Sequence, residues 1–585
     1  MPVDGGEPKQ LTDFPAGVSD PVFSPDGKFI AISSEIYPEC GIDADCHEKT
    51  AKDDDEGKLN VHLADDLLYR HWTSWADGKA SHVLLVDAGT GSVVKDMTPG
   101  PWVTPTFSLG GSRGYGFSPD GKELVFVSNR EADQASTTNA DLWLVSIDGE
   151  INEDSAVNIT TENDGWDGAP LYSPDGRHIA FLSQATPGFE SDFFRLSLYD
   201  REDKTTRRLI DRPAFDNWID DMAWTPDSKA LYFQAESQGR NPLYRVDLEG
   251  AIEKIHTDAY IAGWEVTPDT ETIFYTRRAV GSPPEVFSVA TDGGAPKRLT
   301  SFNANLEAEV DIRPAEEMWV KGAGDYDVHV FLVKPHGFDP AKKYPLILNV
   351  HGGPQSQWMD SYRGDWQVYP GKGYIVAFAN PTGSSGYGQD FVDAISCDWG
   401  GRVFDDLMRV TDALEELPYV DQDRMGAMGW SYGGYMMMWF EGHTDRFKTI
   451  ASMMGLYDLP SFYGATEELW FPERDLCGTP WDSDHYERWS PSRYVDNFKT
   501  PALVVTGELD YRVPYTQSLG FFTALKKKGI EARLVVFPDA GHWPSWHEMA
   551  FYYNTHIDWF HRYLGGEPAT WDVEAHARNQ AFGDD

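Results

Sequence analysis

The stretch Met425-Gly426-Ala427-Met428-Gly429-Trp430-Ser431-Tyr432-Gly433-Gly434-Tyr435-Met436 decides how the rest of the chain is interpreted. Its centre matches G-x-S-x-G, the pattern of a nucleophilic serine on a sharp turn between a strand and a helix. Residues 424–428 predict a short buried strand before the turn, and residues 435–440, rich in Met and aromatic residues, predict a buried helix after it. We therefore expect Ser431 to be a nucleophile at the carboxyl edge of a sheet.

A second match shows that the pattern alone is weak. Gly110-Gly111-Ser112-Arg113-Gly114 lies among Pro, Thr and Gly residues and is followed by the turn Ser118-Pro119-Asp120-Gly121. Because this context offers no step from strand to helix, we interpret Ser112 as a loop serine.

A serine nucleophile needs a base, and the base needs an acid that orients it. Asp510 follows a predicted buried strand at residues 502–506, and His542 lies in the loop after the next predicted strand, residues 533–537. The order Ser, Asp, His is that of α/β-hydrolases, and both side chains are expected at the edge where the serine turn opens. Two acids and one histidine remain open as alternatives: Glu508, Asp539 and His547.

Acyl transfer also needs hydrogen-bond donors for the developing oxyanion. One expected donor is the backbone N–H of Tyr432, directly after the nucleophile. The other should come from His351-Gly352-Gly353-Pro354, which follows a continuous apolar run at residues 344–350. Gly353 is the expected donor and Gly352 the alternative.

Composition limits the class of protein. The chain of 585 residues is too long for one core, and its 21 Trp, 27 Tyr and 31 Phe allow large ones. A net charge of −45 argues against a nucleic-acid partner, because phosphate binding needs a basic face. No apolar run approaches the length of a membrane helix, and residues 1–6 do not resemble a signal peptide.

The cysteines and histidines do not predict a metal or another cofactor. The sequence contains neither C-x-x-C nor H-E-x-x-H, the usual patterns of zinc ligands. Cys40 and Cys46 are close enough in sequence to be bonded in an oxidising compartment, whereas Cys397 and Cys477 lie far apart. Whether Cys40 and Cys46 are bonded stays open at this point.

The first half of the chain is repetitive. Each copy of a short turn is preceded by apolar residues and followed by a strand-like run, and Pro, Asp and Gly each favour the turn. Spacings of 42 to 55 residues, with four short strands in each interval, predict the blades of a β-propeller. The copies begin at Ser24, Ser118, Ser173, Thr225 and Thr267.

Two irregularities interrupt this repeat. The first interval is longer and holds an insertion near residues 37–75, which we interpret either as a surface loop or as a wall of the substrate chamber. Residues 5–12 match residues 293–300, which close a blade. We therefore expect the chain to begin in the last strand of a blade whose earlier strands are missing.

From about residue 317 the pattern changes to buried strands alternating with helices, which predicts a doubly wound α/β sheet. Residues 344–350 and 374–379 are continuous apolar runs, and apolar residues recur at helical spacing between 403 and 417. The sequence thus predicts a propeller over residues 1–316, an α/β-hydrolase domain over residues 317–566 and a polar tail over residues 567–585.

These motifs together resemble the prolyl oligopeptidase family of serine peptidases. The resemblance rests on the two glycine motifs around Gly353 and Ser431, on Asn380-Pro381-Thr382-Gly383-Ser384-Ser385-Gly386-Tyr387-Gly388, and on Gly507-Glu508-Leu509-Asp510-Tyr511-Arg512-Val513-Pro514. It implies a propeller joined to a hydrolase, a Ser-Asp-His triad, an acyl-enzyme and short peptides as substrates. It also favours a periplasmic or secreted location, with a cytoplasmic one left open.

Within that family the chain is most similar to the dipeptidyl-peptidase V branch, through Tyr69-Arg70-His71-Trp72 and Thr466-Glu467-Glu468-Leu469-Trp470-Phe471-Pro472-Glu473. This similarity implies release of N-terminal dipeptides. An exopeptidase must hold the substrate ammonium, which a carboxylate in a partly desolvated pocket does well. We expect Glu467 or Glu468 in that role and an apolar pocket lined by Trp470 and Phe471.

Other interpretations remain. Glu467 and Glu468 also fit a solvated helix face, and Glu35 or Glu39 in the acidic insertion is a rival source of the carboxylate. An acylaminoacyl-peptidase and an esterase share the catalytic motifs. A propeller scaffold with an inactive hydrolase is disfavoured, because all three triad residues are present in the expected order.

Overall fold

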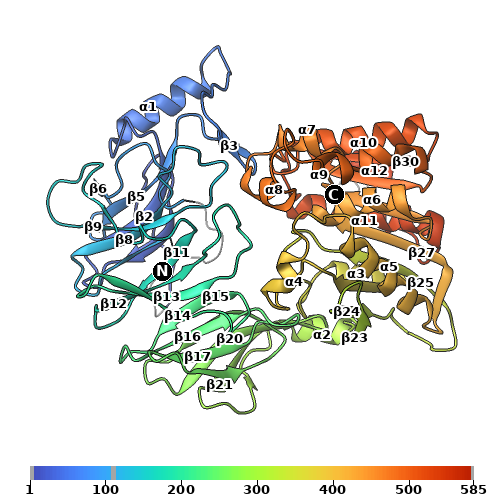
Figure 1. Ribbon diagram of the computed structural model, residues 1–585, viewed down its shortest axis with the longest axis horizontal. Coiled ribbons are helices and arrows are strands. Elements are labelled where there is room, and N and C mark those ends of the chain that lie inside the picture. The colour runs from blue at the N-terminus through green and yellow to red at the C-terminus, as the bar shows by residue number, and fades with distance from the viewer. Residues whose placement is uncertain (1–4, 107–113, 581–585) are drawn as a thin grey trace. The chain divides into compact units, whose positions relative to one another are not determined.

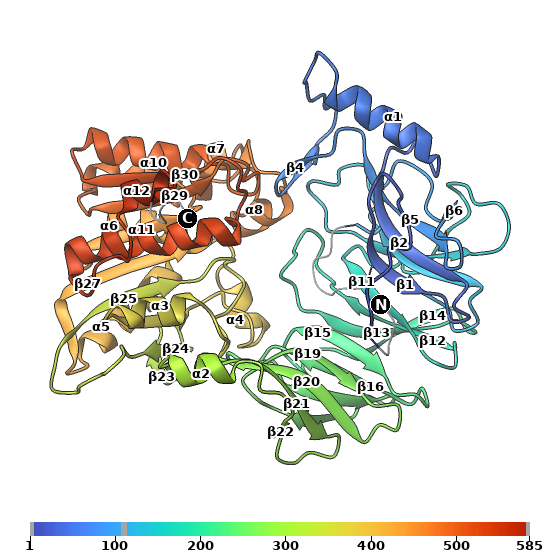
Figure 2. The ribbon, with the colours of Figure 1, turned by 180° about the vertical axis from the view of Figure 1, so that it is seen from behind.

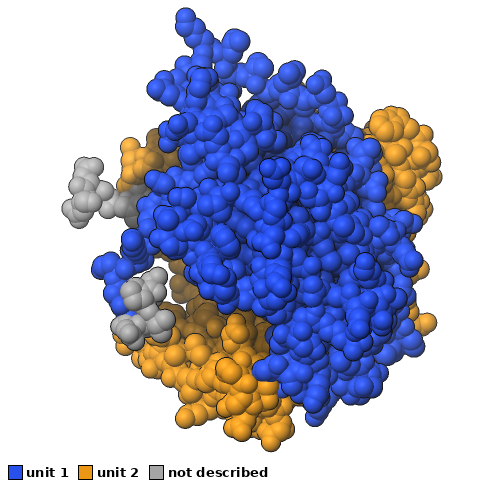
Figure 3. All heavy atoms as spheres, turned by 90° about the vertical axis from the view of Figure 1, so that its left-hand side faces the viewer, with its two compact units in different colours: residues 1–69, 75–235, 244–253 blue, residues 70–74, 236–243, 254–585 orange. Residues whose placement is uncertain are grey.

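The structure, a computed structural model, describes residues 5–106 and 114–580 (Figure 1). Ser112 lies outside the described residues. The chain divides into two compact units, which are coloured separately in Figure 3. Unit 1 consists of residues 1–69, 75–235 and 244–253, and unit 2 of residues 70–74, 236–243 and 254–585.

The repeats form the blades of a β-propeller, as predicted. Among the described residues, the N-terminal half contains five four-stranded sheets, in the orders β1-β2-β5-β6, β10-β9-β8-β7, β11-β12-β13-β14, β15-β16-β17-β18 and β19-β20-β21-β22. Apart from the insertion between β2 and β5, the strands of each sheet follow one another directly in sequence, which is the pattern of a blade. The strands are β1 (Ser19–Phe23), β2 (Phe29–Ile36), β5 (Ala80–Asp87), β6 (Val93–Asp96), β7 (Tyr115–Phe117), β8 (Glu123–Ser128), β9 (Asp141–Ser146), β10 (Val157–Asn158), β11 (Asp167–Tyr172), β12 (His178–Ser183), β13 (Arg195–Asp200), β14 (Thr205–Ile210), β15 (Ile219–Trp224), β16 (Ala230–Ala235), β17 (Leu243–Asp247), β18 (Ile252–His256), β19 (Tyr260–Val266), β20 (Thr272–Ala279), β21 (Ser282–Ala290) and β22 (Lys297–Arg298).

Each repeated turn joins the first two strands of its sheet. In the first copy the N–H of Gly27 donates to the carbonyl of Ser24 (2.9 Å), and the hydroxyl of Ser24 donates to Asp26 (2.8 Å). Gly27 has φ +70°, which explains the glycine. The two looser copies place Ser228 and Thr270 at φ 60°, a conformation that side chains beyond glycine adopt at a cost.

The insertion and the start of the chain differ from the repeat. The insertion contains α1 (Ala44–Asp55), the short strands β3 (Arg70–His71) and β4 (Ser74–Trp75), and a Cys40–Cys46 disulfide. Residues 5–12 were expected to form an outer blade strand, but the structure assigns no strand to them. A strand needs a hydrogen-bonded neighbour, and no described strand pairs with this segment.

An eight-stranded sheet forms the centre of the hydrolase region, with the order β23-β24-β26-β25-β27-β28-β29-β30 among the described residues. The strands from β26 to β30 run parallel, while β23 and β24 form an antiparallel edge (Figure 2). Parallel strands are covered on both faces, which explains their continuous apolar sequences. The strands are β23 (Ala315–Lys321), β24 (Asp327–Val333), β25 (Tyr344–Val350), β26 (Ile375–Asn380), β27 (Val420–Trp430), β28 (Thr449–Met453), β29 (Ala502–Gly507) and β30 (Ala532–Phe537).

Both faces of this sheet are buried. On β25, Ile347 packs in a core cluster with α3 and α11, while its neighbours Leu346 and Leu348, which point to the other face, are also fully buried. In residues 5–106 and 114–580, no helix has the length and apolar character that a membrane crossing requires. The remaining helices are α2 (Ala304–Glu309), α3 (Asp365–Gly371), α4 (Gln389–Asp393), α5 (Arg402–Glu415), α6 (Tyr432–His443), α7 (Leu459–Tyr463), α8 (Trp470–Asp475), α9 (His485–Arg488), the 3-10 helix η1 (Pro491–Asn497), α10 (Thr516–Lys527), α11 (Trp546–Leu564) and α12 (Val573–Ala577).

The segment expected to be a polar tail contains ordered structure. Helix α12 packs on α11, where His576 is buried against Phe551 (ring centroids 5.2 Å apart). The N–H of Trp571 donates to Asn554, whose amide in turn donates to the carbonyl of Trp571. The rings of Trp571 and His576 thus supply aromatic surface in an otherwise polar segment, and His576 packs on α11.

Candidate active site

Ser431 lies at a sharp turn between β27 and α6. Its φ of 59° and ψ of −118° are unusual for a residue other than glycine and cost on the order of 1–3 kcal/mol. The N–H of Ser431 donates to the carbonyl of Met453 on β28 (2.9 Å), and its carbonyl accepts from the N–H of Tyr435 (2.9 Å). These bonds fix the strained turn, and Ser431 keeps exposed surface although the helix behind it is buried.

The glycines of the motif allow the end of β27, the start of α6 and the end of β25 to approach closely at this turn. A Cβ on Gly429 would lie 2.4 Å from the carbonyl oxygen of Gly433, and a Cβ on Gly433 would lie 2.1 Å from that of Val350. Both distances are far below contact, so neither position accepts a side chain. Close backbone contacts therefore explain why glycine stands at positions 429 and 433 of the G-x-S-x-G motif.

His542 is paired with Asp510. Nδ1 of His542 lies 2.6 Å from Oδ2 of Asp510, and the other carboxylate oxygen accepts from the N–H of Val513 (2.8 Å). The indole N–H of Trp430, next to Ser431, donates to the carbonyl of His542 (3.1 Å). Both partners of the pair are buried, at 3% and 1% exposure, so the pair is held in one orientation.

The competing groups occupy different surroundings. Glu508 and Asp539 are exposed, and so is His547, which lies in the first turn of α11. The structure therefore places Asp510, and neither alternative acid, on His542.

The loop after β25 brings a glycine backbone over the serine. A Cβ on Gly352 would lie 3.0 Å from Cβ of Ser431. Nδ1 of His351 lies 2.7 Å from the carbonyl oxygen of Gly352, and burial lowers the pKa of His351 to about 4, so the ring is neutral and Nδ1–H donates. Because C=O and N–H point in opposite directions across a trans peptide, this bond turns the N–H of Gly353 away from His351.

Glu467 and Glu468 are buried in the loop between α7 and α8, and they do not form the solvated helix face that was left open. Arg512 bonds both carboxylates, with Nε 2.8 Å from Oε1 of Glu467. Nε2 of His71 lies 2.9 Å from Oε1 of Glu468. Burial raises the pKa of Glu467 against the opposing effect of Arg512.

Residues 70–74 of the N-terminal insertion belong to the same unit as this cluster. The N–H of Trp72 donates to Glu467, and its carbonyl accepts from the N–H of Tyr511 (2.9 Å). The Trp72 ring lies 5.8 Å from the His542 ring and beneath the guanidinium of Arg512, 4.0 Å away. The sequence allowed the insertion to be a wall of the substrate chamber, but it assigned no individual role in the site to Trp72 or Arg512.

The two expected pocket aromatics differ from each other. Trp470 is 1% exposed and has little surface to offer a substrate, because its indole packs inside the domain. Phe471 keeps exposed surface and lies 5.8 Å from the Arg512 guanidinium. The burial of Trp470 does not support its expected place in a pocket wall, whereas Phe471 lies beside the cluster.

One group in the described part of the chain has the spacing of metal ligands. Atoms of His71, Glu467 and Glu468 lie within 4.8 Å of one another. Arg512 already neutralises part of this negative charge from a distance of 2.8 Å. Because the Arg512 guanidinium already contacts both carboxylates, they do not form an open set of ligands for a divalent ion.

A separate cleft of about 1340 Å³ lies within unit 1, between the outer strands of the second and third blades. Its walls combine polar, charged and apolar side chains, with Arg201 and Glu123 paired at 2.5 Å. None of the residues predicted for the site lines this cleft.

Comparisons with known proteins agree with this architecture. Residues 360–567 match the Prolyl oligopeptidase family, and residues 116–322 match the TolB beta propeller domain. The chain is 32% identical over 567 residues to dipeptidyl-peptidase 5 of Porphyromonas gingivalis, covering 94% of this chain and 80% of the relative. It is 31% identical over 548 residues to dipeptidyl-peptidase 5 of Aspergillus fumigatus, covering 87% and 74%.

Among solved structures, the acylaminoacyl peptidase of Pyrococcus horikoshii aligns with a TM-score of 0.79 at 22% identity, over 95% of this chain and 83% of that one. At this identity the likeness concerns the fold, a propeller joined to an α/β-hydrolase domain.

Proposed function

The chain belongs to the prolyl oligopeptidase family and is a serine peptidase, and from this premise we propose that it releases dipeptides from the free amino terminus of short peptides. The proposed nucleophile is Ser431, the base is His542 and the orienting acid is Asp510. The dipeptidyl specificity is supported above all by the buried cluster of Glu467, Glu468 and Arg512.

In the proposed reaction the Ser431 hydroxyl attacks the scissile carbonyl while His542 accepts its proton through Nε2. Asp510 holds Nδ1–H of His542 and stabilises the imidazolium that forms. The N–H groups of Gly353 and Tyr432 receive the oxyanion. Collapse of this intermediate expels the peptide amine, which takes the proton from His542, and water then hydrolyses the acyl-enzyme by the same steps.

The charge of the cluster suits an ammonium group. The two carboxylates share one guanidinium, so a single full positive charge faces two acidic groups. Oε2 of Glu468 is buried and has no hydrogen-bond partner in the described part of the chain. A buried acceptor without a partner is unfavourable until a donor arrives, and a substrate ammonium supplies both the hydrogen and the charge.

In this proposal the cluster limits the length of the released fragment. Trp72 links the cluster to the catalytic histidine, because its N–H bonds Glu467 while its ring lies beside His542. An ammonium held at Glu468 therefore sets how many residues fit before the bond presented to Ser431. The acyl group of a blocked substrate cannot supply the ammonium.

The test compares Glu468→Gln with the wild type on three substrates: a dipeptidyl anilide, an N-acetyl amino-acid anilide and a simple ester. We expect KM for the dipeptidyl substrate to rise about 10- to 100-fold, which corresponds to the loss of one charge-assisted hydrogen bond, while ester hydrolysis is kept. Glu508→Gln removes an exposed carboxylate near Asp510 and is the matched control.

The same assay distinguishes the alternatives. A wild type that prefers the N-acetylated substrate would refute dipeptidyl release and indicate an acylaminoacyl-peptidase. A wild type that cleaves only the ester would indicate an esterase on this fold.

A further inference from the structure

Asp475, the last residue of α8, is a buried carboxylate outside the triad and the acidic cluster. It is 2% exposed, and burial raises its pKa. Its hydrogen-bond donors are all neutral: Nε2 of Gln355 lies 3.0 Å from both oxygens, Nε1 of Trp399 3.0 Å from one, and the Ser396 hydroxyl 3.2 Å from the other. A buried charge is retained at such a site only if several hydrogen bonds support it.

Two of these donors lead to the two sides of the proposed oxyanion hole. Gln355 lies two residues after Gly353, in the turn that follows it. Trp399 accepts through its backbone carbonyl from the hydroxyl of Tyr432, whose N–H is the other proposed donor. One carboxylate thus connects the glycine loop to the first residue of the nucleophile helix.

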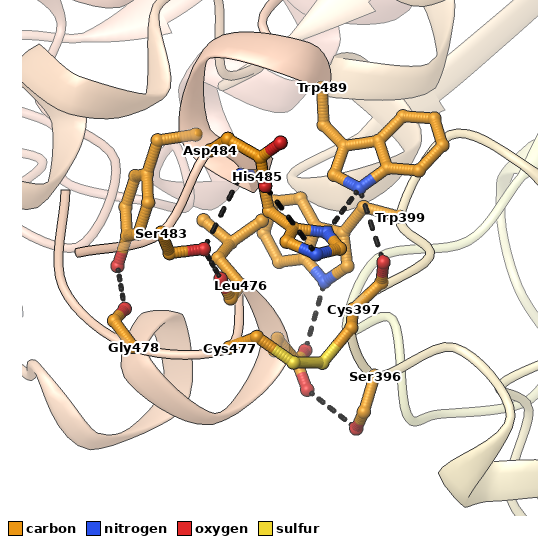
Figure 4. Close-up of a disulfide and its surroundings, with 12 residues drawn as sticks. Ser396, Cys397, Trp399, Leu476, Cys477, Gly478, Ser483, Asp484, His485 and Trp489 are labelled. Atoms are coloured by element: carbon orange, nitrogen blue, oxygen red, sulfur yellow. Dashed lines mark hydrogen bonds and ion pairs between the residues drawn. A yellow bond between two sulfur atoms is a disulfide. The ribbon is translucent and has the colours of Figure 1, made fainter.

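A disulfide, shown in Figure 4, joins the segment before Trp399 to the segment after α8. Cys397 is bonded to Cys477, two residues after Asp475, and the N–H of Cys397 donates to the carbonyl of Asp475 (2.7 Å). Both cysteines have positive φ, 65° and 58°, a conformation that needs support from its surroundings. The loop carrying Ser396 and Trp399 is therefore held to the end of α8 by the disulfide, one backbone hydrogen bond and two side-chain hydrogen bonds.

We propose that Asp475 is a positioning residue that sets the separation between the N–H of Gly353 and the N–H of Tyr432. The inference rests on the proposed function, because it concerns the oxyanion hole of that reaction. Oxyanion donors act only within about 2.7–3.1 Å of the oxygen, so a small shift of one loop loses much of their effect. Asp475 holds both loops through Gln355 and Trp399 and touches neither substrate nor Ser431.

The chain offers matched variants for a test. Asp475→Asn keeps the shape and removes the charge, and Gln355→Met cuts only the connection to the glycine loop. Ser396→Ala also removes a hydrogen bond to Asp475, but Ser396 bonds neither Gly353 nor Tyr432. The double variant Asp475→Asn with Gln355→Glu exchanges amide and carboxylate and rebuilds the bond.

The readout is the ratio of kcat/KM for a dipeptidyl ester to that for its thiono analogue, in which sulfur replaces the carbonyl oxygen. Sulfur fits an oxyanion hole poorly, so the ratio reports the hole itself, while general loss of folded enzyme lowers both values equally. We expect Asp475→Asn and Gln355→Met to lower kcat for the ester about 10- to 1000-fold, with KM nearly unchanged and the ratio reduced by a similar factor. Ser396→Ala should keep the ratio, and the double variant should restore it in part.

The outcomes separate this inference from the proposed function. A lower kcat with an unchanged ratio would mean that Asp475 is structural only and would overturn the inference. A higher KM for dipeptidyl substrates with an unchanged ratio would place its effect on the ammonium cluster and would also overturn it. If Asp475→Asn fails to fold, Gln355→Met on the partly exposed loop decides. A wild type that hydrolyses neither ester refutes the proposed function itself.

Discussion

Acid should destabilise this protein through a buried histidine of α11. His556 is fully buried, its Nδ1 lies 2.8 Å from the Tyr369 hydroxyl, and its Nε2 is buried with no hydrogen-bond partner among the described residues. Burial lowers the pKa of His556 to about 3 from an ordinary 6.5. Below about pH 6.5 the unfolded chain therefore binds a proton at this histidine, whereas the folded protein does not. The free energy of unfolding falls as the pH drops from about 6.5 toward 3.

The size of this effect follows from the pKa difference. At about pH 5 the unfolded histidine lies roughly 1.5 pH units below its pKa, which corresponds to about 2 kcal/mol of lost stability at about 1.36 kcal/mol for each unit. Urea denaturation of the wild type and of His556→Gln, at about pH 8 and about pH 5, measures it. Between the two pH values the wild type should lose about 2 kcal/mol more than the variant.

The control is His547→Gln, which removes an exposed histidine from the first turn of the same helix and should lose as much stability as the wild type. Equal losses for the wild type and His556→Gln would show that His556 is not a source of the acid sensitivity. His351, with a pKa of about 4, adds the same acid sensitivity to every protein compared and cancels in the difference.

Two further predictions concern the triad and the disulfides. Asp510→Asn should keep the fold and lower kcat about 10⁴-fold, because His542 loses the partner of its Nδ1–H; full activity in this variant would move the acid to Glu508 or Asp539. Replacing Cys397 and Cys477, which are 80 residues apart, with serine should lower the free energy of unfolding by about 4–5 kcal/mol. The same replacement of Cys40 and Cys46, which are 6 residues apart, should lower it by about 2 kcal/mol, because closing a longer loop restricts the unfolded chain more. Equal losses for the two pairs in urea denaturation would contradict this prediction.

The fold was predictable because its determinants are local. The Ser/Thr-Pro-Asp turns recur between the first two strands of each blade, and the continuous apolar runs at 344–350 and 502–506 became β25 and β29. The sharp turn at Ser431 was predicted from the G-x-S-x-G pattern, and its glycines lie where the neighbouring backbone leaves no space for a Cβ. Asp510 and His542 were found because each follows a strand that ends at the same edge of the sheet.

The missed features depend on contacts between distant segments. Glu467 is buried because Trp72 and Arg512, 395 and 45 residues away, bond it, and no local pattern distinguishes that from a solvated face. The pairing of Cys397 with Cys477 likewise joins segments 80 residues apart. Trp470 was predicted to line a pocket because aromatic residues do so often, but its neighbours cover it completely. The Tyr69-Arg70-His71-Trp72 stretch was the only local signal that the insertion reaches the site.

The most direct test of the central claim is labelling by a fluorophosphonate, which reacts with an activated serine nucleophile, followed by mass spectrometry of the labelled peptide. We expect the wild type and Ser112→Ala to be labelled on the peptide that contains Ser431, and Ser431→Ala to be neither labelled nor active on a dipeptidyl anilide. Labelling and turnover that survive in folded Ser431→Ala would mean that Ser431 is not the nucleophile.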